Sequence, residues 1–374
     1  MESSSGTDNV IAALGRSNHV HHVLLDLASW QLEEVLAAMQ VPFPELTELR
    51  LISESETPPV IPDSFLGGCV SRLQYFSLSG IPFPGLPKLL LSANYLVDLW
   101  FSRIPHSGYI SPEAMAALLS VLSNLRTLSL QFQSPRSRPD RETRRPPPSK
   151  RYVIPSLLDI RFKGVIEYLE DIVTFIDTPQ LRSFHITFFN QIDFYIPRLV
   201  QFVNCTPTLK ARDEAHVLFD DYLACVRLSL GPRTLNVAVS CREPDWQLSS
   251  IEQVCDSSLH PISTVEDLYI EHRYQQLVWK DDTIENTQWW QLLLPFTAVK
   301  NLYLSKEFAP GVAAALQEFV GGRIAQVLPG LQNIFVEGLR VEPSGRFQEN
   351  IGQFVAARQL SDHPIAISDW DTDR

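Results

Sequence analysis

The sequence predicts an α/β fold in which short strands and helices alternate along one stacked core. The main observation is a pattern, L-x-x-L-x-L, that recurs ten times between residues 20 and 336. The last part of each unit alternates in period two, as a strand with one buried face does. Segments with a helical spacing of apolar residues lie between these strands. One strand and one helix per unit therefore account for almost the whole chain.

The units begin 23 to 34 residues apart, except for one interval of 84 residues that can hold two or three degenerate units. Their first positions are Val20, Leu46, Leu73, Leu96, Leu125, Leu157, Leu181, Val265, Val299 and Leu331. This period is the signature of leucine-rich repeats. We therefore predict a leucine-rich-repeat solenoid (a horseshoe) of about 11–13 units, with parallel strands on the concave face and helices on the convex face.

Helices are predicted in the intervals between strands. Residues 29–40 carry apolar side chains on one helical face, and Ser111 followed by Pro112 is a helix start signal. Further helices are expected over 168–175, 197–203, 283–294 and 311–320. A doubly wound α/β sheet is the alternative. Such a sheet usually has a glycine-rich turn between strand and helix, and this sequence has none.

Several segments depart from the regular repeat. We expect a disordered N-terminus over residues 1–6, the solenoid over 7–345 and a C-terminal cap over 346–374, with an amphipathic helix at 347–357. Residues 217–241 read as an irregular, strand-rich insertion with turns at Asp220-Asp221 and Gly231-Pro232.

Residues 134–151 are rich in proline and arginine. The segment has seven basic residues, two acidic residues and five prolines, a composition that opposes collapse. We interpret it as a disordered, solvated loop inserted after the fifth strand. The alternatives are a basic docking arm, a nuclear-import patch, or a phosphorylation switch at Ser134-Pro135.

Composition excludes several classes of function. The net charge is −12, so the chain has no overall basic footprint, and we expect no nucleic-acid partner. No run of about 18 uncharged apolar residues predicts a membrane span. Five cysteines without a C-x-x-C pair argue against a disulfide framework or a zinc site and favour the cytoplasm or nucleus.

Motifs for catalysis, phosphate binding or metal binding are absent from the sequence. His19, His21 and His22 form the one histidine cluster; in a strand His19 and His21 share one face and could contact a metal, but no third ligand is near them in sequence. We therefore predict a protein that is not an enzyme, with no catalytic residues, no cofactor and no metal.

A binding surface is the better candidate, because the residues between the apolar positions point outward on the concave sheet. We predict that a protein substrate or peptide binds there. The candidate residues at the central outward position are Arg50, Trp100, Arg161, His185, Tyr269, Tyr303 and Phe335. Three of them, Tyr269, Tyr303 and Phe335, should lie on neighbouring strands and could anchor a partner. Alternatively, C-terminal helices or loops cover them as part of the core.

The chain also resembles the leucine-rich-repeat region of fungal F-box proteins, the expanded group of mushroom-forming fungi. The resemblance spans nearly the whole chain, and the segments that carry it are IPFPGLPKLLLSA (81–93), IPHSGYISPEAM (104–115), FQSPRSRPDRETRRPPP (132–148), DTPQLRSFHITFFNQIDF (177–194), PFTAVKNLYLS (295–305) and IGQFVAARQL (351–360).

This resemblance implies the substrate-recognition part of a Skp-cullin-type ubiquitin ligase. Family members usually carry an F-box before the repeats, which binds a Skp-type adaptor. No F-box is visible here, and residues 8–17 already resemble the start of the repeat region. A Skp-type adaptor is therefore expected only if an F-box lies upstream. The alternative is a standalone leucine-rich-repeat binding protein with no ubiquitin role.

The loop interpretation makes a first testable prediction. Deleting residues 134–151 should leave the thermal unfolding temperature unchanged, because a solvated loop contributes no buried contacts. Differential scanning calorimetry measures this temperature, and a large decrease would refute the loop interpretation.

Overall fold

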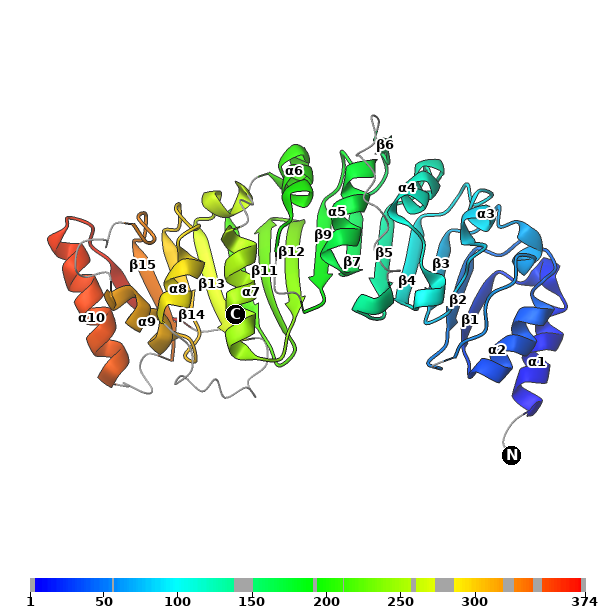
Figure 1. Cartoon of the computed structure of the whole chain (residues 1–374), viewed down its shortest axis with the longest axis horizontal. Helices are drawn as coiled ribbons and strands as arrows, with labels where there is room; N and C mark the ends of the chain where they lie inside the picture. The colour runs from blue at the N-terminus through cyan, green and yellow to red at the C-terminus, as the bar shows by residue number, and fades with distance from the viewer. Residues whose placement is uncertain are drawn as a thin grey trace. The chain divides into compact units, whose positions relative to one another are not determined.

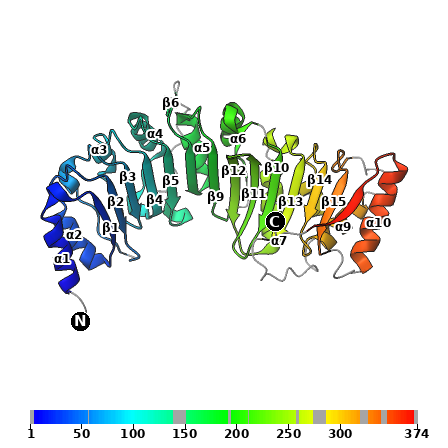
Figure 2. The same ribbon diagram turned by 180° about the vertical axis from the view of Figure 1, so that it is seen from behind.

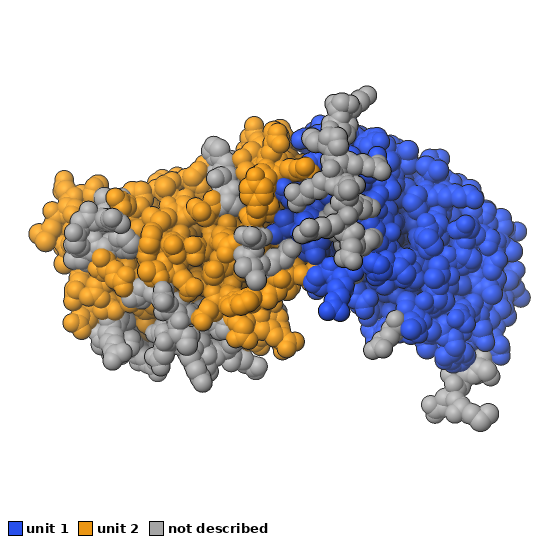
Figure 3. Space-filling model, in the orientation of Figure 1, with its two compact units in different colours: residues 1–181 blue, residues 182–374 orange. Residues whose placement is uncertain are grey.

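The computed structural model describes residues 4–55, 57–137, 151–190, 194–210, 212–256, 260–272, 286–318, 326–338 and 345–370. The chain divides into two compact units, Met1–Leu181 and Arg182–Arg374 (Figure 3). Each unit is mixed α/β and is built on a mostly parallel sheet, with its helices packed on one face of the strands (Figure 1).

The sheet of the first unit has a strand order that follows the chain. Neighbouring strands are all parallel. The strands are β1 (His22–Asp26), β2 (Glu48–Ile52), β3 (Tyr75–Ser79), β4 (Asp98–Ile104), β5 (Thr127–Phe132) and β7 (Asp159–Gly164). Two short strands, β6 (Tyr152–Val153) and β8 (Ile176–Asp177), pair separately. An order without reversal is not that of a doubly wound sheet.

The helices of the first unit are α1 (Ser4–Leu14), α2 (Ser29–Ala38), α3 (Leu86–Leu90), α4 (Pro112–Val121) and α5 (Ile166–Phe175). The start signal for α4 is used as predicted: Ser111 is the N-cap, and its hydroxyl accepts a hydrogen bond from the Ala114 N–H at 3.3 Å. Pro112 occupies the first turn, where no helical N–H bond is lost.

The sheet of the second unit has the order β9-β12-β11-β10-β13-β14-β15-β16 (Figure 2). These strands are β9 (Ser183–Phe188), β10 (Glu214–Phe219), β11 (Leu223–Leu230), β12 (Arg233–Ser240), β13 (Asp267–His272), β14 (Asn301–Leu304), β15 (Asn333–Glu337) and β16 (Ala366–Trp370). Its helices are α6 (Pro197–Cys205), α7 (Pro244–Asp256), α8 (Asn286–Leu293), α9 (Ala309–Gln317) and α10 (Gly345–Leu360).

A strand lies at each of the ten L-x-x-L-x-L positions: β1, β2, β3, β4, β5, β7, β9, β13, β14 and β15. The apolar positions face the helices and form the core; for example, Leu49, Leu99 and Leu302 have no exposed surface. The spacing thus places the strands and the buried face of each strand. Helices α1, α3 and α7 were not predicted.

The irregular segment contains the strands β10, β11 and β12 and begins at Glu214, three residues before the predicted start at about residue 217. The pairs β10–β11 and β11–β12 are antiparallel, whereas β12 pairs parallel with β9 and β10 pairs parallel with β13. Gly231 makes the second turn with a φ of +56°, a conformation that costs glycine little.

Two predicted segment boundaries need correction. The predicted disorder over residues 1–6 is wrong for residues 4–6, because α1 begins at Ser4. This helix packs on α2, where Gln31 donates a hydrogen bond to the hydroxyl of buried Thr7 at 3.2 Å. The packing supplies contacts that composition alone does not indicate. Residues 1–3 lie outside the described residues.

The predicted disordered loop at 134–151 is also too long. Pro135–Ser137 form a short 3-10 turn, and the Arg136 carbonyl lies 3.1 Å from His106 Nδ1. Residues 138–150 lie outside the described residues. A deletion confined to 138–150 keeps this contact and is therefore the stricter form of the deletion experiment.

The buried leucines predict a specific loss of stability. Leu302→Ala should lower the free energy of unfolding by about 2–5 kcal/mol, because it leaves a cavity at a fully buried position. Leu360→Ala is the matched control, since Leu360 is 90% exposed and should change stability little. Equal effects of both variants on chemical denaturation would contradict the assignment of the buried face.

Candidate functional site

The outward face of the first unit carries one row of side chains at equivalent positions on six strands. Parallel pairing aligns them in register as Leu24, Arg50, Ser77, Trp100, Ser129 and Arg161. The predicted candidates Arg50, Trp100 and Arg161 therefore belong to one row. Arg50 and Arg161 are exposed, and Trp100 is half-buried.

Arg161 and Trp100 contact each other across the intervening strand. The guanidinium carbon of Arg161 lies 5.1 Å from the Trp100 ring centroid, within the range of a cation–π interaction. Ser129 lies between them in the row and has no exposed surface. The small serine leaves room for the two long side chains to meet above it. Asp159 Oδ1 accepts a hydrogen bond from Arg161 Nε at 3.3 Å and orients the guanidinium.

Arg103 forms a second feature of this unit, near the carboxyl ends of β2, β3 and β4. It has a left-handed φ of +50° and donates hydrogen bonds to the Ser53 carbonyl and the Ser79 hydroxyl, both at 3.1 Å. Gly80, at φ +72°, has no room for a side chain, because a Cβ would lie 2.4 Å from the Ser53 oxygen. Arg103 was not predicted as a site residue, because it lies just outside the repeated pattern.

The outward row of the second unit includes four stacked aromatic rings, which we call the aromatic ladder: His216, Tyr269, Tyr303 and Phe335. The ring centroids are 4.4, 4.2 and 4.5 Å apart in that order, and neighbouring planes are within 9° of parallel. All four rings are half-buried. The structure thus brings together the three aromatics expected on neighbouring strands and adds His216.

His216 was missed because β10 lacks the L-x-x-L-x-L pattern. The available signal is the alternation of buried Ala215 and Val217 around it, which marks a strand but does not identify its neighbour. Conversely, the predicted candidate His185 lies in the same register row but is separated from the ladder by Asn236 and Arg227. Its Nε2 lies 2.8 Å from the Ser183 hydroxyl.

Carboxylates and amides flank the ladder. Asn333 donates a hydrogen bond to Asn301 at 2.7 Å, and Asn301 donates to Asp267 at 2.6 Å. These two hydrogen bonds link the three strands β13, β14 and β15. On the other flank, His216 Nδ1 lies 3.3 Å from Glu271 Oε2. The flanking rows therefore link neighbouring strands and place acidic oxygens beside the rings.

Trp370 of β16 reaches over two of these rings. Its ring centroid lies 5.5 Å from that of Tyr303 and 6.0 Å from that of Tyr269, with interplanar angles of 65° and 56°. A C-terminal residue thus covers part of the ladder, while all its rings keep some exposed surface. The covered-core interpretation expects this contact with Trp370, and the partner-anchor interpretation needs the surface of the rings that stays exposed.

Burial raises the pKa of Tyr269, and the neighbouring Tyr303 and Asp267 raise it further. Burial likewise raises the pKa of Tyr303, and Asp267 adds to the shift. Both phenols therefore remain neutral to a higher pH than exposed tyrosines.

Two buried cysteines and the histidine cluster are other potentially reactive side chains. Burial raises the pKa of the Cys241 and Cys255 thiols, which disfavours the nucleophilic thiolate. His22 of the histidine cluster lies 3.3 Å from Glu48. Within the described ranges, no group of three or more His, Cys, Asp or Glu could hold a metal ion.

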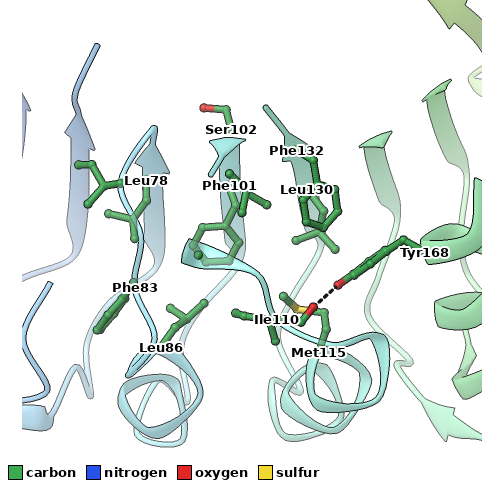
Figure 4. A pocket seen from close by; sticks show the side chains of 13 residues that line it. Leu78, Phe83, Leu86, Phe101, Ser102, Ile110, Met115, Leu130, Phe132 and Tyr168 are labelled. Atoms are coloured by element: carbon green, nitrogen blue, oxygen red, sulfur yellow. Dashed lines mark hydrogen bonds between the residues drawn. The ribbon is translucent and has the colours of Figure 1, made fainter. Parts of the chain in front are cut away.

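The first unit also contains an apolar cavity between its sheet and helices α3 and α4 (Figure 4). It has a volume of about 20 Å³, enough for a single water molecule. The Tyr168 hydroxyl beside it donates a hydrogen bond to the Ile110 carbonyl at 3.0 Å. The cavity is a small packing gap without convergent polar groups.

No protein-family model matches the chain, and no curated protein sequence has significant similarity to it. Among the helices in the described part of the chain, none combines the length and apolar character needed to cross a membrane.

The tyrosine pKa shifts predict a late phenol titration. Above the ordinary pKa of about 10, the native ladder keeps protons that the unfolded chain has lost, so stability should fall as pH rises through this window. Tyr269→Phe with Tyr303→Phe should remove the late part of the phenolate absorbance titration. An unchanged late titration in this variant would contradict the shifts.

Proposed function

We propose that this chain is a non-enzymatic protein-interaction scaffold of the leucine-rich-repeat type that recruits a protein substrate or peptide through its outward strand faces. The observation that carries the proposal is the in-register row on each unit, which gathers arginine, tryptophan and tyrosine side chains. These residue types are enriched among the side chains that dominate protein–protein binding energy.

The repeat architecture is part of the proposal. A strand at each L-x-x-L-x-L position and parallel in-register pairing support a stack of leucine-rich repeats. One repeat cannot bury its leucines alone, so each repeat depends on its neighbours. Such stacks present broad surfaces that suit macromolecular partners better than small substrates.

The ubiquitin role is a further step of the proposal. It rests on the resemblance of the sequence to the substrate-recognition part of F-box proteins, and it requires a Skp-type adaptor bound through an F-box upstream of the repeats. The competing proposal is a standalone binding protein that uses the same outward face without the ubiquitin system. Co-purification of a Skp-type adaptor with the product of the complete reading frame separates the two.

The test of the scaffold compares two double variants of the full chain. Trp100→Ala with Arg161→Ala removes the cation–π pair of the outward row. Trp30→Ala with Arg126→Ala makes the same chemical changes at exposed positions outside the row. Each variant is checked for folding by circular dichroism and then used for affinity purification with quantitative mass spectrometry.

We expect the row variant to lose its partners at least about tenfold, because binding energy is concentrated in a few tryptophan and arginine side chains. The control should retain the partners of the unaltered chain. Identical partner sets for both variants would refute recruitment through this row.

A further inference from the structure

The aromatic ladder of the second unit has an electrostatic character that suggests a class of partner. The rings stack face to face along the row, so their edges, rather than their faces, point away from the sheet. Four rings at a strand spacing of about 4.8 Å form an apolar strip roughly 14 Å long. This length corresponds to four or five residues of an extended peptide.

Carboxylates border the strip on both flanks. Glu214 and Asp267 lie in the flanking row on one side, and Glu271 and Glu337 lie on the other. None of the outward positions of β10, β13, β14 and β15 carries lysine or arginine; these positions are Glu214, His216, Leu218, Asp267, Tyr269, Glu271, Asn301, Tyr303, Asn333, Phe335 and Glu337. The next position of the row, beside His216, is Arg227 of β11, so the acidic flanks belong to the four strands of the ladder.

The donors that contact Glu214 and Asp267 are neutral. The Ser229 hydroxyl donates a hydrogen bond to Glu214 at 3.2 Å, and the Asn301 amide donates to Asp267 at 2.6 Å. Hydrogen bonds from neutral groups orient these carboxylates without cancelling their charge. The same two carboxylates also raise the pKa of Tyr303, so their field reaches the ladder.

We propose that the aromatic ladder and its flanking carboxylates bind an extended basic peptide segment that carries arginine. Flanking rows lie two residues away along each strand, about 7 Å, which is within the reach of an arginine side chain. The aliphatic stem of such an arginine packs on the ring edges, while its guanidinium binds a flanking carboxylate through two parallel hydrogen bonds. Trp370 adds an aromatic wall above Tyr269 and Tyr303.

Charge complementarity selects this occupant over an acidic one, because an acidic peptide would place like charges beside Glu214 and Asp267. The inference rests on the proposed function, since it names the partner class of one outward face. It concerns the second unit, whereas the scaffold test above alters the first, so the two can fail separately.

The test measures binding of two fluorescein-labelled octapeptides to the purified full chain by fluorescence anisotropy. One peptide alternates arginine with leucine, and the other alternates glutamate with leucine. Glu214→Gln with Asp267→Asn removes two charges beside the ladder. Asp221→Asn with Glu243→Gln, both exposed and outside the row, is the control that removes the same net charge.

We expect the basic peptide to bind and the acidic peptide not to bind. The ladder variant should weaken binding of the basic peptide at least tenfold, and the control less than twofold. Tyr303→Leu should also weaken binding, because it interrupts the strip while keeping an apolar side chain. Circular dichroism and the thermal unfolding temperature verify that each variant is folded.

Equal weakening by the ladder variant and the control would show attraction to the net charge of −12 alone and would overturn the proposal. Binding of the acidic peptide, or no binding of the basic one, would overturn it as well. If the peptide result is negative while the Trp100 and Arg161 variant still loses its partners, the scaffold stands and the basic-peptide site does not.

Discussion

Parallel pairing in register is the constraint on which both faces of each sheet depend. Because strand side chains alternate, alignment of Leu99 with Leu128 on the buried face also aligns Trp100 with Ser129 on the outward face. A shift by one residue would move the leucines to solvent, so burial of the core fixes the register strongly. The register that the buried leucines set therefore also aligns the side chains of the outward rows.

The irregular segment of the second unit also pairs parallel and in register with the strands on either side of it. An insertion of antiparallel strands reverses chain direction at each turn, and β10, β11 and β12 are an odd number of strands. The two outer strands therefore run in the same direction, and each pairs parallel with its neighbour, β12 with β9 and β10 with β13. This arrangement aligns His216 with Tyr269 and extends the row to a strand that lacks the L-x-x-L-x-L pattern.

The sequence predicts those parts of the fold that repeat and leaves out those that depend on a single contact. Ten strands and the row positions of Trp100 and Tyr303 follow from the sequence pattern, because the same alternation of apolar and outward positions recurs in each strand. The order of β10, β11 and β12 does not follow, since local alternation marks a strand without naming its partner. Arg103 was missed because it lies just outside the repeated pattern, and Trp370 because the rings that it contacts lie on strands distant in sequence.

The first and second units use the same register to build different surfaces, and the size of neighbouring side chains explains the difference. In the first unit, serines alternate with large residues, and Ser77 and Ser129 are 7% and 0% exposed beneath them. Their small volume leaves the Trp100 ring accessible to the Arg161 guanidinium. In the ladder every position is aromatic, and a strand spacing of about 4.8 Å allows such rings to fit only upright and stacked. The ladder therefore presents ring edges, so charge recognition on that face falls to the flanking carboxylates.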